Sequence, residues 1–255
     1  EEYSLAEYNF GLIFGLAVQL YQATLVSDDT PFDRYAAGDR AAMSEQAQQG
    51  MVLFFDTVRV RCINCHGGSE LTDASHTRVK ALPLRRREGN LQDRGFNNIG
   101  VRPTLEDIGL GEVDPWGTPL SMARLATLGL FSDPTVSPPV GTNEKLSDDG
   151  AFKTPGLRNV ELTAPYFHNG GTLTLRGVID FYSRGGDFGF PQNRSGQPIS
   201  ALSVPNLTES EREALVAFMK ALTDERVRYR QAPFDHPQLF VPNGHAGAAG
   251  LVDDD

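Results

Sequence analysis

The chain has 255 residues, of which 40% are hydrophobic, and it carries a formal net charge of −10 at pH 7. This length fits one large domain or two small ones and is sufficient to bury a core. The negative charge disfavours binding to nucleic acid or to an anionic membrane surface, and it favours a partner protein that presents a basic face.

The first predicted helix covers Leu5–Leu25, where apolar residues recur with helical spacing. A turn cluster that ends in Pro31 follows it. Its most apolar part, from Phe10 to Leu20, is too short to span a bilayer, so no transmembrane segment is expected. The acidic start Glu1-Glu2 does not resemble a signal peptide, and we expect any leader to lie upstream of residue 1.

A second helix is predicted to begin at Ser44, whose hydroxyl can cap the following turn, and to lead towards the run Cys62-Ile63-Asn64-Cys65-His66. This C-x-x-C-H run is the attachment signature of c-type haem. Its spacing lets the two thiols form thioethers to the two vinyl groups, and it places the adjacent histidine under the iron. The sequence therefore predicts one covalent haem c with His66 as the proximal ligand.

Two other interpretations of the motif are a Cys2His2 metal site and a redox-active dithiol. Cys62 and Cys65 are the only cysteines, so no further thiolate is present for a zinc ribbon or an iron–sulfur cluster. A thioredoxin-like dithiol needs a βαβ context that the pattern does not provide. Because haem c is attached outside the bacterial cytoplasm or on an equivalent membrane face, we expect a periplasmic or otherwise exported protein.

The segment from Gly67 to Gly117 is rich in glycine, asparagine, aspartate and proline and is predicted to be mostly loop. It contains the basic run Arg85-Arg86-Arg87. This run is interpreted as a solvated loop rather than as a docking or propionate contact.

Three helices are predicted further along, at Ser121–Leu128, at Thr174–Tyr182 and from the capping box at Thr208 through Leu222. The tail from Gln231 has neither a helical nor a strand period. The fold class is therefore mainly α: a cytochrome-c-like helical haem domain with long loops over residues 1–230, and an irregular C-terminal arm over residues 231–255.

An iron held by His66 has a sixth position, and its occupant decides the function. A methionine raises the potential and suits an electron carrier, an anionic oxygen lowers the potential, and an open site permits peroxide chemistry. The methionine and histidine candidates are Met43, Met51, Met122, Met219, His76, His168, His236 and His245. Composition and spacing do not choose among them.

The stretch from Phe152 to Gly171 closely resembles the C-terminal haem domain of bacterial di-haem cytochrome c peroxidases, whose relatives include the enzyme that matures methylamine dehydrogenase. The resemblance covers most of residues 10–225. It includes Thr24–Ser27, Pro31–Tyr35, Gly50–Phe55, Phe96–Val101 and Leu215–Thr223. In that family the matched domain receives electrons from a small donor protein and passes them to the peroxidatic haem. The resemblance therefore implies the electron-transfer half of a peroxidase-type oxidoreductase.

The same resemblance implies a sixth iron ligand. The family's distal methionine lies fourteen positions after the histidine that matches His168, and that place is held here by Tyr182. The methylamine-dehydrogenase maturation enzyme is similar in carrying an iron-ligating tyrosine there. We therefore expect Tyr182 as the ligand, with Met219 as the alternative, and His168 near the haem edge.

Two further assignments come from the resemblance. Arg158 is expected to contact a haem propionate, because a guanidinium fork fits a carboxylate, with a surface ion pair as the alternative. Backbone oxygens at Thr163 and Pro165 match the family's interdomain calcium site, so a calcium ion is a further candidate.

The departures from the family concern the haem count and one loop. The chain has a single C-x-x-C-H, whereas family members carry two haems, so a second haem domain lies upstream or on another chain, or the protein works with one haem. The segment Leu71–Gly95 is longer than the usual connection.

Electron transfer with a small cytochrome or a cupredoxin-like donor is the favoured function. The alternatives are a stand-alone mono-haem carrier and a haem module that reacts with peroxide or oxygen itself.

Overall fold

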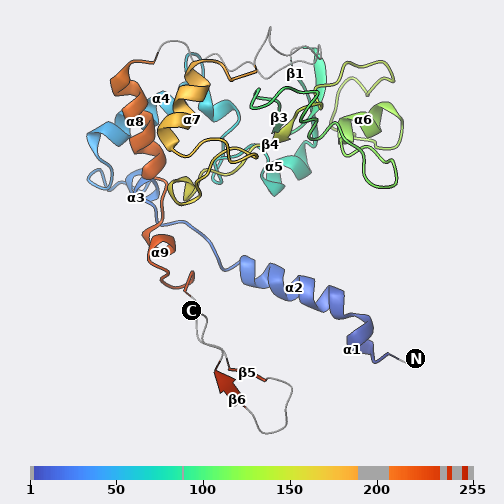
Figure 1. The fold of residues 1–255 in the computed structure, drawn as a ribbon, viewed down its shortest axis with the longest axis horizontal. Helices are drawn as coiled ribbons and strands as arrows, with labels where there is room; N and C mark the ends of the chain where they lie inside the picture. Colours follow the sequence, from blue (N-terminus) through green and yellow to red (C-terminus); the bar gives the residue numbers. More distant parts are fainter. Residues whose placement is uncertain (1–2, 88, 189–206, 236–239, 243–248, 252–255) are drawn as a thin grey trace. The chain divides into compact units, whose positions relative to one another are not determined.

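The computed structural model describes residues 3–87, 89–188, 207–235, 240–242 and 249–251. The chain divides into two compact units, one made of residues 1–30 with 224–255 and the other of Pro31–Thr223. The regular structure of the described part is mainly helical, and its strands form short antiparallel pairs (Figure 1). The division predicted at residue 230 stays a prediction.

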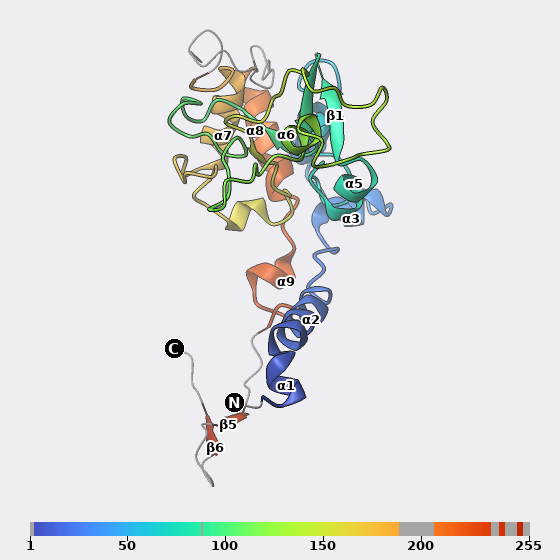
Figure 2. The same cartoon turned by 90° about the vertical axis from the view of Figure 1, so that its right-hand side faces the viewer.

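The larger unit contains a helical layer in which α4 and α7 both pack against α8 (Figures 1 and 2). The predicted caps are confirmed, because side chains at Ser44, Thr174 and Thr208 accept hydrogen bonds from the first turns of α4, α7 and α8. These caps satisfy N–H groups that have no partner within the helix. The helices are α3 (Pro31–Ala36), α4 (Glu45–Phe55), α7 (Leu175–Ser183) and α8 (Glu209–Lys220).

The main hydrophobic core lies where these helices meet. Phe54 of α4 packs on Phe218 of α8 with ring centroids 5.1 Å apart, and Phe32 meets Phe218 edge-on at 5.6 Å. Ala47 and Gly50 lie on the same side of α4 as Phe54, two turns and one turn before it respectively, and all three are buried. Small residues at these positions let the two helix backbones approach closely.

Gly50 is the point of closest approach. A Cβ atom there would lie 1.8 Å from the Ala214 carbonyl oxygen. We expect Gly50→Ala to lower the free energy of unfolding by at least about 1–3 kcal/mol, because the backbone of α8 has to move away. Denaturant titration of both variants measures this, with Gly141→Ala as the control, since a Cβ at Gly141 meets nothing within 4 Å. Equal stability of the two variants would contradict the packing argument.

The segment predicted as loop from Gly67 to Gly117 contains regular structure, so that prediction was wrong in part. It carries α5 (His76–Ala81), the hairpin of β1 (Leu84–Arg87) and β2 (Asn90–Asp93), and β3 (Phe96–Asn97), which pairs with β4 (Phe152–Lys153). The strands are so short that no period can be recognised in the sequence. Their stability comes from cross-strand pairing and side-chain contacts, which local sequence does not report.

The hairpin β1–β2 packs on α6 (Met122–Thr127), the helix predicted at Ser121–Leu128. Leu84 and Leu91 are buried with two alanines of α6. The Asp93 carboxylate accepts hydrogen bonds from the Ser121 hydroxyl at 2.7 Å and from the first two N–H groups of α6. A negative charge at a helix N-terminus is favourable, so the hairpin is held to α6 by both apolar and polar contacts.

The smaller unit contains α1 (Leu5–Tyr8), α2 (Phe10–Gln22) and α9 (Glu225–Arg228). The first predicted helix is thus divided at Asn9, which ends α1 and precedes α2, and it stops at Gln22 rather than Leu25. The tail, predicted to be irregular, contains the antiparallel pair β5 (Phe240–Pro242) and β6 (Ala249–Leu251). None of the helices among the described residues has the length and apolar character required to cross a membrane.

Candidate haem-binding site

The C-x-x-C-H motif follows a tight turn at the end of α4. One carboxylate oxygen of Asp56 accepts hydrogen bonds from two backbone N–H groups of this turn, at 2.7 and 2.8 Å. Arg61 then adopts a left-handed backbone with φ 60°, and a short 3-10 helix, η1 (Cys62–Asn64), begins. The His66 N–H donates to the Cys62 carbonyl at 2.9 Å, so the motif forms one compact turn beside the core.

Neither cysteine forms a disulfide, and both are half-buried. Burial raises the pKa of the Cys62 thiol to about 12 and also raises the pKa of Cys65. Redox-active dithiols require the opposite, a lowered thiol pKa that favours the reactive thiolate. The environment therefore disfavours the dithiol interpretation and suits thiols that end as thioethers.

The His66 ring has a defined orientation. Its Nδ1 lies 3.2 Å from the Leu71 carbonyl oxygen and must donate to it, because a carbonyl only accepts. Leu71 is 2% exposed and has a left-handed backbone with φ 53°, which its buried side chain holds in place. Burial lowers the pKa of His66, which favours the neutral imidazole. The Nε2 atom is then the nitrogen available to a metal.

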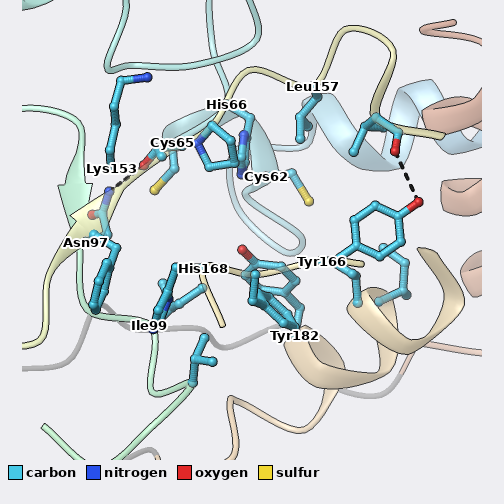
Figure 3. Close-up of a pocket in the computed structure, with 18 of the residues that line it drawn as sticks. Cys62, Cys65, His66, Asn97, Ile99, Lys153, Leu157, Tyr166, His168 and Tyr182 are labelled. Carbon is cyan, nitrogen blue, oxygen red and sulfur yellow. Dashed lines mark hydrogen bonds between the residues drawn. The ribbon is translucent and has the colours of Figure 1, made fainter. Parts of the chain in front are cut away.

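A cavity of about 430 Å³ adjoins the motif. Cofactor sites in proteins span roughly 300–1,000 Å³, so the size suits a prosthetic group. His66 and Tyr182 lie on opposite sides of this space, with Cys62 and Cys65 beside His66 (Figure 3). Most of the wall is apolar, with side chains that include Phe54, Ile99, Leu157, Leu175, Ile179 and Leu215.

Tyr182 comes from the last turn of α7, the helix capped by Thr174. Burial raises the pKa of its phenol. A phenol in this environment keeps its proton unless a cation binds the oxygen. The position opposite His66 is the one that a sixth iron ligand requires.

The other candidate ligands differ in their access to the cavity. Of the four methionines, all within the described residues, Met219 alone lines it, and that side chain is 5% exposed within the core. Met43 and Met51 pack in the main core, and Met122, the first residue of α6, packs against the cluster formed with the β1–β2 hairpin. His236 and His245 lie outside the described residues. Among the described residues, the candidate ligands that line the cavity are Tyr182, Met219 and His168.

The His168 ring stacks on Phe152 with centroids 3.6 Å apart, and its Nε2 lies 2.5 Å from a carboxylate oxygen of Asp107. Both members of this pair line the cavity. The sequence did not indicate Asp107, because it is 61 positions from His168 and lies in a loop. The contact places a candidate acid–base pair beside the cavity that no local pattern predicts.

Arg158 does not line the cavity. Its guanidinium forms two hydrogen bonds with the Asp33 carboxylate, at 2.7 and 2.8 Å, and a third with the Ser69 carbonyl at 2.8 Å. This geometry matches the ion-pair alternative rather than the expected propionate contact.

The arginine and lysine side chains that do line the cavity wall are Arg61, Arg87, Arg102 and Lys153. Lys153 forms no ion pair with any residue that the structure describes. Arg87 is close enough to Cys65 to stabilise its thiolate. The interpretation of Arg85-Arg86-Arg87 as a solvated loop was wrong, because these residues form β1 and alternate between two faces. Three identical residues carry no such alternation in the sequence, so no local signal could have identified Arg87.

The proposed calcium positions, Thr163 and Pro165, also line the cavity. The Thr163 hydroxyl donates to the Val160 carbonyl at 3.1 Å, at the end of a second 3-10 helix, η2 (Val160–Leu162). The calcium assignment stays a prediction.

The residues present fit a c-type haem. Two thiols and a neutral imidazole lie on one wall, a tyrosine lies opposite, and apolar side chains form the remaining surface. Lys153 on this wall can offset the charge of a propionate. This donor set is the one that covalent attachment and axial ligation need.

No protein-family model matches the chain. Among characterised proteins, it is 36% identical over 219 residues to the cytochrome-c peroxidase IdrP1 of Denitromonas iodatirespirans, covering 81% of this chain and 48% of that protein. It is 29% identical to the methylamine utilization protein MauG of Methylorubrum extorquens, covering 82% of this chain and 43% of MauG. The chain thus spans about half the length of these relatives.

A solved structure is also similar. The crystal structure of a MauG-like protein associated with microbial copper homeostasis has a TM-score of 0.51 and 33% identity, over 82% of this chain and 55% of that one. Sequence and structure therefore agree with the resemblance found in the stretch from Phe152 to Gly171. The chain belongs to the bacterial di-haem cytochrome c peroxidase family.

Proposed function

We propose that this chain is a cytochrome-c-like haem domain that carries electrons within a peroxidase-type oxidoreductase. The observation that supports it is the placement of Cys62, Cys65 and His66 on one wall of an apolar cavity, with Tyr182 facing them (Figure 3). Haem c, when bound, supplies reversible one-electron chemistry. The two thiols tether it, the Leu71 carbonyl orients the His66 ring, and the apolar walls exclude water.

Tyr182 is proposed as the sixth ligand. A phenolate is a hard anionic donor, so it favours the ferric state and lowers the potential relative to methionine. A protein ligand at this position also closes the site to peroxide. The closed sixth position suits a domain that relays electrons rather than one that reacts with substrate.

The peroxide-reacting haem is proposed to belong to a second domain, upstream or on another chain, since the chain spans about half the length of its relatives. A small cytochrome or cupredoxin-like protein with a basic face is proposed as the donor, because the chain carries a net charge of −10. Calcium at Thr163 and Pro165 is proposed to bind at the junction of the two domains. An exported location follows from haem c attachment.

Mass spectrometry under denaturing conditions tests the haem assignment. The chain produced in a haem-competent host should retain one haem, whereas a Cys62→Ala/Cys65→Ala double variant should show only the polypeptide mass. Asn64→Ala is the matched control, because it alters the motif without removing a thiol and should keep the haem. A polypeptide mass without haem for the parent chain would refute the proposal.

The pair of His168 and Asp107 favours a second candidate function, a haem that reacts with peroxide or oxygen in this domain. A histidine held 2.5 Å from a carboxylate beside the cavity is suited to move a proton. This candidate requires an open sixth position, which Tyr182 opposes. The two functions therefore make opposite predictions for turnover by the isolated chain.

A further inference from the structure

A buried carboxylate lies behind the His66 side of the cavity. Asp73 is 1% exposed, and its backbone N–H donates to the Cys65 carbonyl at 2.8 Å. Leu71, two residues before Asp73, holds the His66 ring through its carbonyl oxygen, which lies 3.2 Å from Nδ1. The carboxylate is therefore within electrostatic reach of the imidazole that would bind the iron.

Arg85 is the cation that compensates this carboxylate. Its Nη1 donates to Oδ2 of Asp73 at 2.9 Å, and its Nη2 donates to the Asn97 side-chain oxygen at 3.3 Å. With the Gln92 amide oriented to accept, its oxygen lies 2.8 Å from two guanidinium nitrogens of Arg85. The other oxygen of Asp73, Oδ1, has no hydrogen-bond partner among the described residues. Arg85 thus supplies the direct counter-charge.

A second cation, Arg94, also lies in the field of Asp73. Its Nε donates to the Leu82 carbonyl at 2.6 Å rather than to the carboxylate. Arg94 therefore compensates the charge of Asp73 only from a greater distance. It does not replace the direct contact that Arg85 makes with the carboxylate.

The hairpin β1–β2 places Arg85 in direct contact with the Asp73 carboxylate. Arg85 pairs in register with Gln92, and Arg86, the next residue, points to the opposite face and binds Glu144 at 2.6 Å. The same strand therefore directs one arginine towards the haem motif and the next one away from it. The hairpin lies in the segment Leu71–Gly95.

We propose that Arg85 is a positioning residue that sets the reduction potential of this site through Asp73. The inference rests on the proposed haem function. A ferric centre carries one more positive charge than a ferrous one, so a buried negative charge nearby favours the ferric form. The effect is strong where the surroundings have a low dielectric. By cancelling the charge of Asp73, Arg85 favours the ferrous form and raises the potential. The electron comes from an external reductant, and no bond of the chain is made or broken.

Potentiometric titration of the haem absorbance, with redox mediators, tests this in the haem-loaded chain. At a fixed solution potential, Arg85→Gln should raise the ferric-to-ferrous ratio about tenfold. For a one-electron couple, this corresponds to a reduction potential of the haem that is lower by ~59 mV. Asp73→Asn should shift it in the opposite direction. The double variant Arg85→Gln/Asp73→Asn should return close to the parent, because the buried pair is again neutral.

Two variants act as controls. Arg86→Gln removes a charge from the same strand on the face towards Glu144 and should leave the potential unaltered. Arg85→Lys keeps the charge and should restore most of the parent potential. If Arg85→Gln fails to fold, Asp73→Asn and the double variant still show whether the charge of Asp73 lowers the reduction potential.

An unaltered potential in haem-loaded Arg85→Gln, or a double variant that stays as far from the parent as the single one, overturns the proposal. So does an Arg86→Gln shift as large as that of Arg85→Gln. Absence of covalent haem in the parent chain would instead refute the proposed function. The two failures are therefore distinguishable.

Discussion

Replacing Tyr182 with phenylalanine should change the ferric absorption and EPR spectra and raise the reduction potential. The phenolate oxygen is lost while the ring is kept, so the anionic stabilisation of the ferric state disappears. We expect the ferric-to-ferrous ratio to change more than tenfold, which is a rise of more than ~59 mV for a one-electron couple. Spectra of the oxidised protein and a potentiometric titration measure the two effects.

Tyr166→Phe is the matched control for this prediction. Tyr166 also lines the cavity, but its hydroxyl donates to the Val160 carbonyl at 3.1 Å, so its removal should leave the spectrum unaltered. Met219→Leu tests the competing ligand and should likewise have no effect. If Met219→Leu alters spectrum and potential while Tyr182→Phe does not, the tyrosine assignment is wrong and a high-potential carrier is the better interpretation.

The isolated chain should be a poor peroxidase. If Tyr182 fills the sixth position, peroxide has no access to this iron, and the peroxide-reacting haem belongs to a domain outside this chain. Steady-state consumption of peroxide, with a reduced small cytochrome as donor, should fall far below the usual enzyme range of ~1–1,000 per second. Supplying a haem-loaded second domain should restore turnover.

Turnover within that range by this chain alone would refute the electron-transfer assignment and favour the reactive haem. The variant Asp107→Asn then discriminates the source of the activity, because a proton transferred by His168 depends on its carboxylate partner. Loss of about 10²–10⁴-fold would identify a general acid–base pair. An unchanged rate would assign the activity to a contaminant or to free haem.

Local sequence was sufficient for the parts of the site that are local in structure. The motif from Cys62 to His66 needs only its own spacing, and the caps at Ser44, Thr174 and Thr208 act within one helical turn. Tyr182 could be suggested only by resemblance, since no pattern of this chain distinguishes it from other tyrosines.

Contacts between distant segments could not be predicted in the same way. The partner of Arg158 is Asp33, 125 positions away, so a guanidinium expected at a propionate is used in an ion pair. The basic run at Arg85 has the composition of a loop, and only pairing with β2 and burial of Leu84 reveal a strand. In both cases the tertiary partner, rather than the residue type, determined the role.

The proposed haem tether at Cys62 and Cys65 would have a consequence for the unfolded chain. Thioether bonds persist when helices separate, so a denatured chain would keep its iron while losing the contact between α7 and α8 that places Tyr182. The histidines His76, His168, His236 and His245 could then compete for the vacated position, and such loops make a denatured ensemble more compact. Absorbance of the haem would then report on the detachment of α7. The loss of helix would be followed separately by circular dichroism, so the two transitions could be told apart.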